Sequence, residues 1–295
     1  TNLLSLICLV EEIKTSSQST PLSKKTGQTK MKLIDKIKSN NKSGKISFVS
    51  YITAGDPDIK TSLNIMENLA ENGTDIIELG VPFSDPISDG PTIQKATERA
   101  LSNKVDMKKV LDLVKKFRKN YSTPIVIFGY YNPFLKYGLN KIMKDIKAAG
   151  ANGVLVVDLP PEEAEEIQYA VNRQNLELVY LVAPTSTNKR IQTIAKLSNS
   201  FIYLVSVTGV TGTRTSLDSN LVPFIKRLKK QTKRPICVGF GISSPKHVRE
   251  LKKNVDGIVI GSAIIKIIEE NLKNKKEIIK KVSDFSKKIS EATKI

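Results

Sequence analysis

The feature that most constrains this fold is a regular alternation of short apolar runs with amphipathic helical segments along most of the chain. The apolar, β-rich runs are at residues 46–53, 74–80, 124–130, 153–159, 176–183, 201–207, 235–240 and 256–261. Each run is almost continuously apolar, as parallel strands buried on both faces should be. Between the runs, segments such as 107–117 place apolar residues at spacings of three and four, which indicates helices with one buried face.

Eight strand–helix units in one chain have the number and rhythm of a closed barrel. We therefore predict an α/β protein with a single (β/α)8 TIM barrel as its catalytic domain over residues 31–295. A doubly wound open sheet is the alternative, because alternation alone does not close a sheet. Residues 1–30 have almost no large apolar residue after Ile13, so we predict a disordered extension or a leader there.

The chain is strongly basic, with a formal net charge of +18 from 47 basic and 29 acidic residues. Its lysines are spread through the predicted helices, and no nucleic-acid-binding motif accompanies them. We therefore expect a solvated basic surface and no nucleic-acid partner, and the same field would attract a small anionic substrate. The apolar run at residues 3–10 is far too short to span a bilayer, so a soluble protein with no membrane partner is predicted.

The chain has only two cysteines and one histidine, which limits the kinds of catalytic and metal sites that it can form. Cys8 and Cys237 form no CxxC pair, which fits a reducing compartment, and we expect the cytoplasm or a plastid stroma. The single histidine, His247, lies in a helical pattern where a satisfied or solvated side chain is expected. Triads of Ser, His and Asp and histidine-rich metal sites are therefore disfavoured, and no metal site is predicted.

In a barrel of this kind, functional residues should lie at the C-terminal ends of the strands and in the loops that follow them. The stretch "ELGVPFSDPISDGP" begins at such a strand end and carries Glu78, Asp85 and Asp89. Glu78 and Asp89 suit general acid–base catalysis, which needs fixed carboxyls and one with a raised pKa. A paired buried acid is the alternative for Glu78, and a turn or cap role is the alternative for Asp89. For Asp85 we favour a turn that also contacts a partner.

Three glycine-rich turns predict a phosphate site, because glycine lets backbone N–H groups approach an anion. They are "GVTG" at 209–212, "GFGIS" at 239–243 and "GSA" at 261–263, after the sixth, seventh and eighth predicted strands. Ser262 begins a predicted helix, where its hydroxyl and its N–H could both donate. Tight turns between strands and helices are the alternative explanation for these glycines.

The motifs together resemble the tryptophan synthase alpha chain family from about Met31 to the C-terminus. They are "GDP", "ELGVPFSDPISDGP", "YYNP", "VVDLP", "SVTGVTGTR", "GFGISSP" and "GSAIIKIIE". The resemblance implies a lyase of tryptophan biosynthesis that cleaves indole-3-glycerol phosphate to indole and glyceraldehyde 3-phosphate. It also implies no metal or organic cofactor, and a beta chain partner in an alpha2beta2 heterotetramer. Pyridoxal phosphate is then expected only in the beta chain.

The same resemblance assigns site residues by motif. Glu78 and Asp89 are implied to be catalytic, and the remaining residues are implied to bind substrate. The implied phosphate contacts are Gly212, Gly241, Gly261 and Ser262; the indole pocket is lined by Tyr51 and Tyr203; and Thr211 belongs to a loop that closes over the site.

The chain departs from the pattern of many members at two places. This chain has Ser50–Tyr51 where they carry Pro–Phe, and Ser88 where they carry Ala. Tyr51 keeps a flat ring and Ser88 is small, so neither change removes a catalytic group. A stand-alone lyase that releases free indole remains an alternative, as does a barrel that only binds a partner. Intact Glu78 and Asp89 argue against the second of these.

Overall fold

A computed structural model describes residues 31–205, 220–239 and 241–295, and the predicted extension at 1–30 lies outside the described residues. Eight parallel strands form a closed barrel in sequence order. The first strand pairs with the last, for example Val49 with Val259, so the open-sheet alternative is wrong. The strands are β1 Ser47–Thr53, β2 Ile76–Gly80, β3 Ile125–Gly129, β4 Gly153–Val156, β5 Glu177–Val182, β6 Ile202–Val205, β7 Ile236–Gly239 and β8 Gly257–Ile260.

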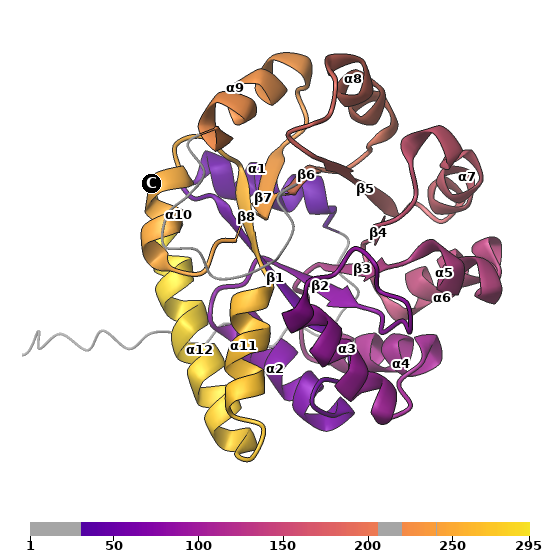
Figure 1. The fold of residues 1–295 in the computed structure, drawn as a ribbon, viewed down its shortest axis with the longest axis vertical. Helices are drawn as coiled ribbons and strands as arrows, with labels where there is room; N and C mark the ends of the chain where they lie inside the picture. Colours follow the sequence, from indigo (N-terminus) through magenta and orange to yellow (C-terminus); the bar gives the residue numbers. More distant parts are fainter. Residues whose placement is uncertain (1–30, 206–219, 240) are drawn as a thin grey trace, which may run out of the picture.

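Helices surround the barrel, as the view down its axis in Figure 1 shows. Two helices begin almost directly after a strand at the C-terminal end of the barrel, α5 after β3 and α11 after β8. The helices are α1 Leu33–Lys42, α2 Ile59–Glu71, α3 Pro91–Ser102, α4 Met107–Arg118, α5 Tyr131–Tyr137, α6 Leu139–Ala149, the 3-10 helix η1 Pro161–Glu163, α7 Glu165–Arg173, α8 Asn188–Leu197, α9 Leu221–Gln231, α10 Pro245–Leu251, α11 Ser262–Glu270 and α12 Lys275–Ala292. None of the helices in the described part of the chain has the length and hydropathy that a bilayer span requires.

The barrel interior is filled by apolar side chains, one from each strand except β6, where the residue directly before the strand contributes, together with two from α1. These are Val49, Ile76, Val126, Leu155, Val179, Phe201, Cys237 and Val259, with Leu33 and Ile37 of α1. Since side chains alternate along a strand, the residues two positions further on point into the C-terminal half of the same interior. Helix α1 therefore closes the N-terminal end, while the other end carries Tyr51, Glu78, Phe128 and Tyr203.

Two buried carboxylates stabilise the closed end. Glu177, at the start of β5, accepts hydrogen bonds from the backbone N–H groups of Leu33 (2.5 Å) and Ile34 (3.1 Å) at the first turn of α1. A carboxylate at a helix N-terminus satisfies amides that lack partners within the helix. Glu177 thus holds α1 in place across the barrel.

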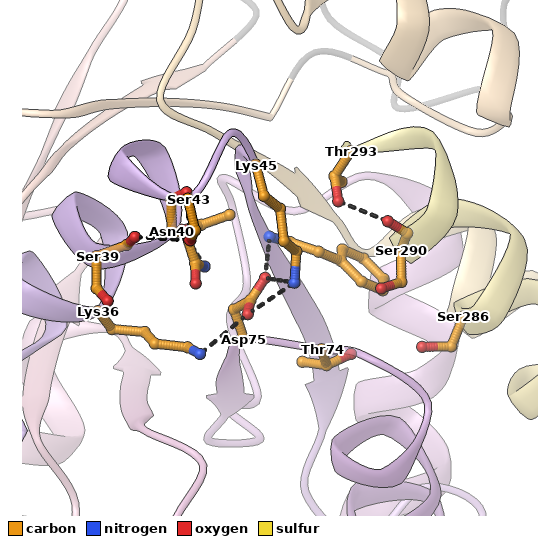
Figure 2. Close-up of polar contacts among 12 residues, drawn as sticks. Lys36, Ser39, Asn40, Ser43, Lys45, Thr74, Asp75, Ser286, Ser290 and Thr293 are labelled. Carbon is orange, nitrogen blue, oxygen red and sulfur yellow. Dashed lines mark hydrogen bonds and ion pairs between the residues drawn. The ribbon is translucent and has the colours of Figure 1, made fainter. Parts of the chain in front are cut away.

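The second carboxylate is Asp75, just before β2. Figure 2 shows it beside the side chains of Lys36 and Lys45. Its oxygens lie 3.2 Å from Lys36 Nζ and 2.9 Å from Lys45 Nζ, and it accepts a hydrogen bond from Phe48 N at 2.9 Å. This acid is fully paired, and it serves the structure of the end remote from the predicted site.

Candidate active site

The C-terminal mouth of the barrel brings together most of the site residues that the sequence predicts. Tyr51 on β1 is the register neighbour of Glu78 on β2. The loop after β2 carries Asp89. Burial raises the pKa of the Tyr51 and Tyr203 phenols, and the nearby charge of Asp89 raises both further. Glu78 contributes to the same two shifts. Two carboxyls and two phenol rings therefore face one space at the end of the strands.

Glu78 is fully buried, and neither carboxyl oxygen has a hydrogen-bond partner in the described part of the chain. Burial alone raises the pKa of Glu78 to about 8, because the ionised form loses its hydration and gains no compensating partner. The carboxyl is therefore mostly protonated at neutral pH. The alternative of a paired buried acid finds no support, and an unpaired polar group in a core calls for another explanation.

Asp89 lies in the turn that precedes α3, and its backbone N–H donates to the carbonyl of Pro86 at 3.0 Å. Gly90, rather than Asp89, is the residue that caps the helix. Burial raises the pKa of Asp89 to about 6, and a hydrogen bond from the Tyr130 hydroxyl opposes that shift. Asp89 is therefore mostly ionised at pH 7, while Glu78 is mostly protonated.

Tyr130 is a site residue that the sequence analysis did not assign. It directly follows β3, is almost fully buried, and its hydroxyl accepts a hydrogen bond from the backbone N–H of Ser88 at 3.0 Å. Its ring also packs against Phe83, with centroids 5.3 Å apart. The phenol thus fixes the loop next to Asp89 from the neighbouring strand. A tyrosine directly after a strand, in "YYNP", was the available signal.

Glycines at the strand ends make room for the two pocket tyrosines. A Cβ atom on Gly80 would lie 2.3 Å from the Tyr51 hydroxyl, and one on Gly261 would lie 3.1 Å from the Tyr51 ring. A Cβ atom on Gly239 would likewise lie 2.3 Å from Tyr203. Gly261 therefore has a packing role in addition to its predicted place in the phosphate site.

The ring of Tyr51 is held edge-on against Phe128, with centroids 5.2 Å apart and an interplanar angle of 77°. Its hydroxyl lies 3.4 Å from Thr53 Oγ1, so the atom that distinguishes it from phenylalanine has a polar neighbour. Ser50, the adjacent departure, is fully buried and shares a 2.7 Å hydrogen bond with the hydroxyl of Thr74. The hydroxyls of Ser50 and Tyr51 therefore each have a polar neighbour.

The structure describes some of the residues that the sequence predicts to bind phosphate. Gly261 caps α11, Ser262 is its first residue, and Gly241 has a φ of +61°, which favours glycine. The first amides of a helix lack intrahelical acceptors, so those of Ser262 and Ala263 are suited to an anion. Thr211 and Gly212 lie outside the described residues.

Two further predicted side chains lie away from the catalytic pair. Asp85 is exposed, and it accepts a 2.5 Å hydrogen bond from Ser84 Oγ while its backbone carbonyl accepts one from Ile87 N at 2.9 Å. This is the turn that was expected for Asp85. His247 is buried on α10, and its Nδ1 accepts a long hydrogen bond (3.4 Å) from Ser243 N, in line with the expected satisfied side chain.

Comparisons with known proteins agree with this arrangement. The family model for the tryptophan synthase alpha chain matches residues 37–294. The tryptophan synthase alpha chain of Geotalea uraniireducens is 47% identical over 224 residues, which are 76% of this chain and 84% of that protein. Tryptophan synthase subunit alpha from Legionella pneumophila has a TM-score of 0.83 at 34% identity, over 89% of this chain and 98% of that one. A chain of the tryptophan synthase a2b2 complex from Pyrococcus furiosus has a TM-score of 0.78 at 38% identity, over 83% and 98%.

Proposed function

The chain belongs to the tryptophan synthase alpha chain family, and from that membership we propose that it is the alpha subunit of tryptophan synthase. In this role it is a lyase that cleaves indole-3-glycerol phosphate to indole and glyceraldehyde 3-phosphate. The observation that carries the proposal within the site is the Glu78 carboxyl, which is fully buried and unpartnered at the mouth of the barrel. Such a group costs stability and is retained where its proton is used.

We assign the first proton transfer to Glu78. Breaking the bond between indole C3 and the glycerol chain requires a proton on C3, which leaves an indolenine-like cation. Glu78 holds a proton at neutral pH, because burial raises its pKa to about 8. Its carboxylate then takes the proton of the glycerol hydroxyl as the aldehyde forms. The electrons of the broken C–C bond return to the ring and neutralise the cation.

We assign stabilisation of that cation to Asp89. An ionised carboxylate near the ring N–H lowers the energy of the positive charge that develops there. The pKa of Asp89, about 6, lies below that of Glu78, about 8, so the two carboxyls hold opposite protonation states at neutral pH. Environments that separate the pKa values of two carboxyls in this way are typical of an acid paired with an ionised partner.

Substrate binding is assigned to the residues around this pair. Tyr51 and Tyr203 contact the indole ring, and Gly241, Gly261 and Ser262 hold the phosphate together with Gly212, under a loop that includes Thr211. Because Glu78 carries out both proton transfers and Asp89 stabilises the cation, we propose that the reaction uses no metal and no organic cofactor.

The proposed partner is a tryptophan synthase beta chain, in an alpha2beta2 complex like that named for the Pyrococcus furiosus protein. Ile87 is 85% exposed and lies beside Asp85 on the loop after β2, at the same face as the site. A partner that receives indole must dock on that face, which supports Asp85 as a partner contact. Pyridoxal phosphate belongs to that beta chain, and we place the chain in the cytoplasm or a plastid stroma.

Replacing Gly241 with aspartate is expected to raise KM for indole-3-glycerol phosphate by roughly 10²-fold, because like charges placed together cost several kcal/mol. Aspartate tolerates a positive φ better than most side chains, so the fold should persist. The measurement is steady-state kinetics with inorganic phosphate as a competing inhibitor. Gly44 has a similar φ, +71°, and open space around it at the closed end, so Gly44→Asp is the matched control. An unchanged KM in Gly241→Asp would remove Gly241 from the phosphate site.

The test of the function is indole release from indole-3-glycerol phosphate by the purified chain, with and without a beta chain. We expect slow release alone, strong stimulation by the beta chain, and co-elution of the two on gel filtration. Equal release in both arms with no complex would favour the stand-alone lyase. No release in either arm, from folded protein, would contradict the proposed function.

A further inference from the structure

A buried ion pair lies outside the catalytic machinery and joins two segments that flank it. Asp56, in the loop after β1, has a fully buried carboxylate. It accepts two hydrogen bonds from Arg99 on α3, from Nε at 2.6 Å and from Nη2 at 2.9 Å. Burial raises the pKa of Asp56, and the charge and hydrogen bonds of Arg99 oppose that shift. A two-pronged arginine–carboxylate pair fixes orientation as well as distance.

Stability alone is a weak reason for such a pair. Removing two charges from water costs several kcal/mol per ion, and an apolar pair of similar volume often serves the fold as well. A buried pair at this place therefore points to a requirement for one defined geometry. We call these two residues the Asp56–Arg99 clamp.

A second contact ties the same end of α3 to the same loop. Asn103, directly after α3, donates from Nδ2 to the backbone carbonyl of Pro57 at 2.6 Å. The last turn of α3 is thus held at two points on the loop between β1 and α2.

The other end of α3 carries the catalytic turn. Gly90 caps the helix, Pro91 is its first residue, and Gln94 Nε2 donates to the backbone carbonyl of Asp89 at 2.8 Å. Asp89 therefore moves with α3, because one side chain of the helix holds its main chain and only Gly90 separates the two. A twelve-residue helix is stiff, so fixing its far end fixes the direction of its first turn.

Helix α3 also packs beside α11, as Figure 1 shows. Lys95 and Glu269 join the two helices through a 3.0 Å ion pair, and Glu269 lies near enough to Asp56 and Arg99 to affect their pKa values. Helix α11 begins at Ser262, in the proposed phosphate site. Of these two neighbouring helices, α3 therefore begins beside Asp89 and α11 begins at the proposed phosphate site.

We propose that the Asp56–Arg99 clamp is a positioning device that sets the place of Asp89 relative to the phosphate site by fixing the far end of α3. Asp56 and Arg99 touch no reacting atom in this scheme. The inference rests on the proposed function for its kinetic consequence, while the clamp's hold on Asp89 is a property of the fold.

The decisive variants are Arg99→Met, which keeps an apolar stem, and Asp56→Asn, which keeps the shape but removes the charge. We expect kcat to fall by about tenfold or more, because misplacing a catalytic group by 1 Å can cost about 10²-fold. The dissociation constant of glycerol phosphate should change little. Arg99→Lys should recover part of kcat. The matched control is Arg190→Met, which breaks an exposed Arg–Glu pair with Glu162 on other helices.

A second readout is independent of turnover: the carboxyl ¹³C titration of Asp89, assigned by its loss in Asp89→Asn. In the part of the chain that the structure describes, the titratable groups that interact with Asp89 are the hydroxyls of Tyr130, Tyr51 and Tyr203, all neutral over the range of the titration. Asp89 should titrate near 6 in the parent and shift toward the ordinary aspartate value of about 3.9 in Arg99→Met, as the loosened turn admits water.

Each outcome decides the inference. A parental kcat and a parental Asp89 titration in folded Arg99→Met would overturn it, and Asp56→Asn decides in the same way if Arg99→Met does not fold. If the parent cleaves no indole-3-glycerol phosphate, the proposed function fails, and the Asp89 titration still tests the clamp.

Discussion

Replacing Glu78 with glutamine is expected to reduce single-turnover indole formation by about 10²–10⁴-fold or more, while the protein stays folded. Glutamine keeps the size and polarity of the side chain, but it has no acidic proton to deliver to indole C3. Because Glu78 makes no hydrogen bond in the described part of the chain, the substitution breaks no contact. A rapid-quench measurement on folded enzyme reads the chemical step without the effects of product release.

The same variant should change how stability depends on pH. The folded-state pKa of Glu78, about 8, lies above the ordinary glutamate value of 4.5, so between these values the folded state keeps a proton that the unfolded state releases. The contribution of Glu78 to stability is therefore present below about pH 4.5 and is lost as pH rises to about 8, by roughly 4 kcal/mol. Glu78→Gln should lack this decline and should be more stable than the parent at pH 8.

The matched control is Glu177→Gln, at the other buried glutamate of the barrel. Glu177 carries its two backbone hydrogen bonds at the closed end, so its loss should lower the melting temperature without affecting the chemical step. If Glu78→Gln forms indole near the parental rate, the assignment of proton transfer to Glu78 is wrong, even though the family and the fold stand.

The sequence predicted the strands well because parallel strands buried on both faces leave an unmistakable apolar run. Each described strand lies within its predicted run, and helix α4 begins at the predicted Met107. Closure of the barrel could be predicted only from the number of strand–helix units. The periodicity of the sequence does not indicate whether the first strand pairs with the last. The observed pairing of β1 with β8 shows that it does.

The candidate site was predictable where ionisable side chains occur at or just after the predicted ends of strands. Glu78 and Asp89 could be singled out because carboxyls at the mouth of a barrel are costly. Their different pKa values could not be predicted, since they depend on which groups approach each oxygen in space. Tyr130 reaches Asp89 from the next strand, and neither the spacing nor the composition of "YYNP" reveals that contact.

Contacts between distant residues were the least predictable. Asp56 and Arg99 are separated by 43 positions, and each occurs in a segment with other adequate explanations. The sequence "AGDP" is typical of a turn, and the position of Arg99 in its segment is typical of a solvent-exposed helix residue. Gly261 was assigned to an anion by its neighbours in sequence, whereas the space above its Cα is filled by the ring of Tyr51. Local patterns identify candidate groups, while the partners of those groups are set by the fold.

Replacing Asp89 with asparagine is expected to lower kcat/KM at pH 7 by about 10²–10³-fold. The amide oxygen can still accept a hydrogen bond from the indole N–H, but it brings no negative charge to the cation. Asp89→Glu should retain a small part of the activity, because a longer carboxylate can still reach the ring if the turn adjusts. Asp85→Asn is the control, since this exposed acid on the same loop should leave turnover by the isolated chain unchanged.

The pH profile makes the test specific to charge. In the parent, kcat/KM should rise as Asp89 ionises near pH 6 and fall as Glu78 loses its proton near pH 8. Asp89→Asn should lose the acidic limb and keep the alkaline one. At pH 5 only about a tenth of the parental Asp89 is ionised, so the gap between parent and variant should narrow about tenfold relative to pH 7. A gap that stays constant between pH 5 and pH 7 would mean that Asp89 acts through its shape and hydrogen bonds, and that another group stabilises the cation.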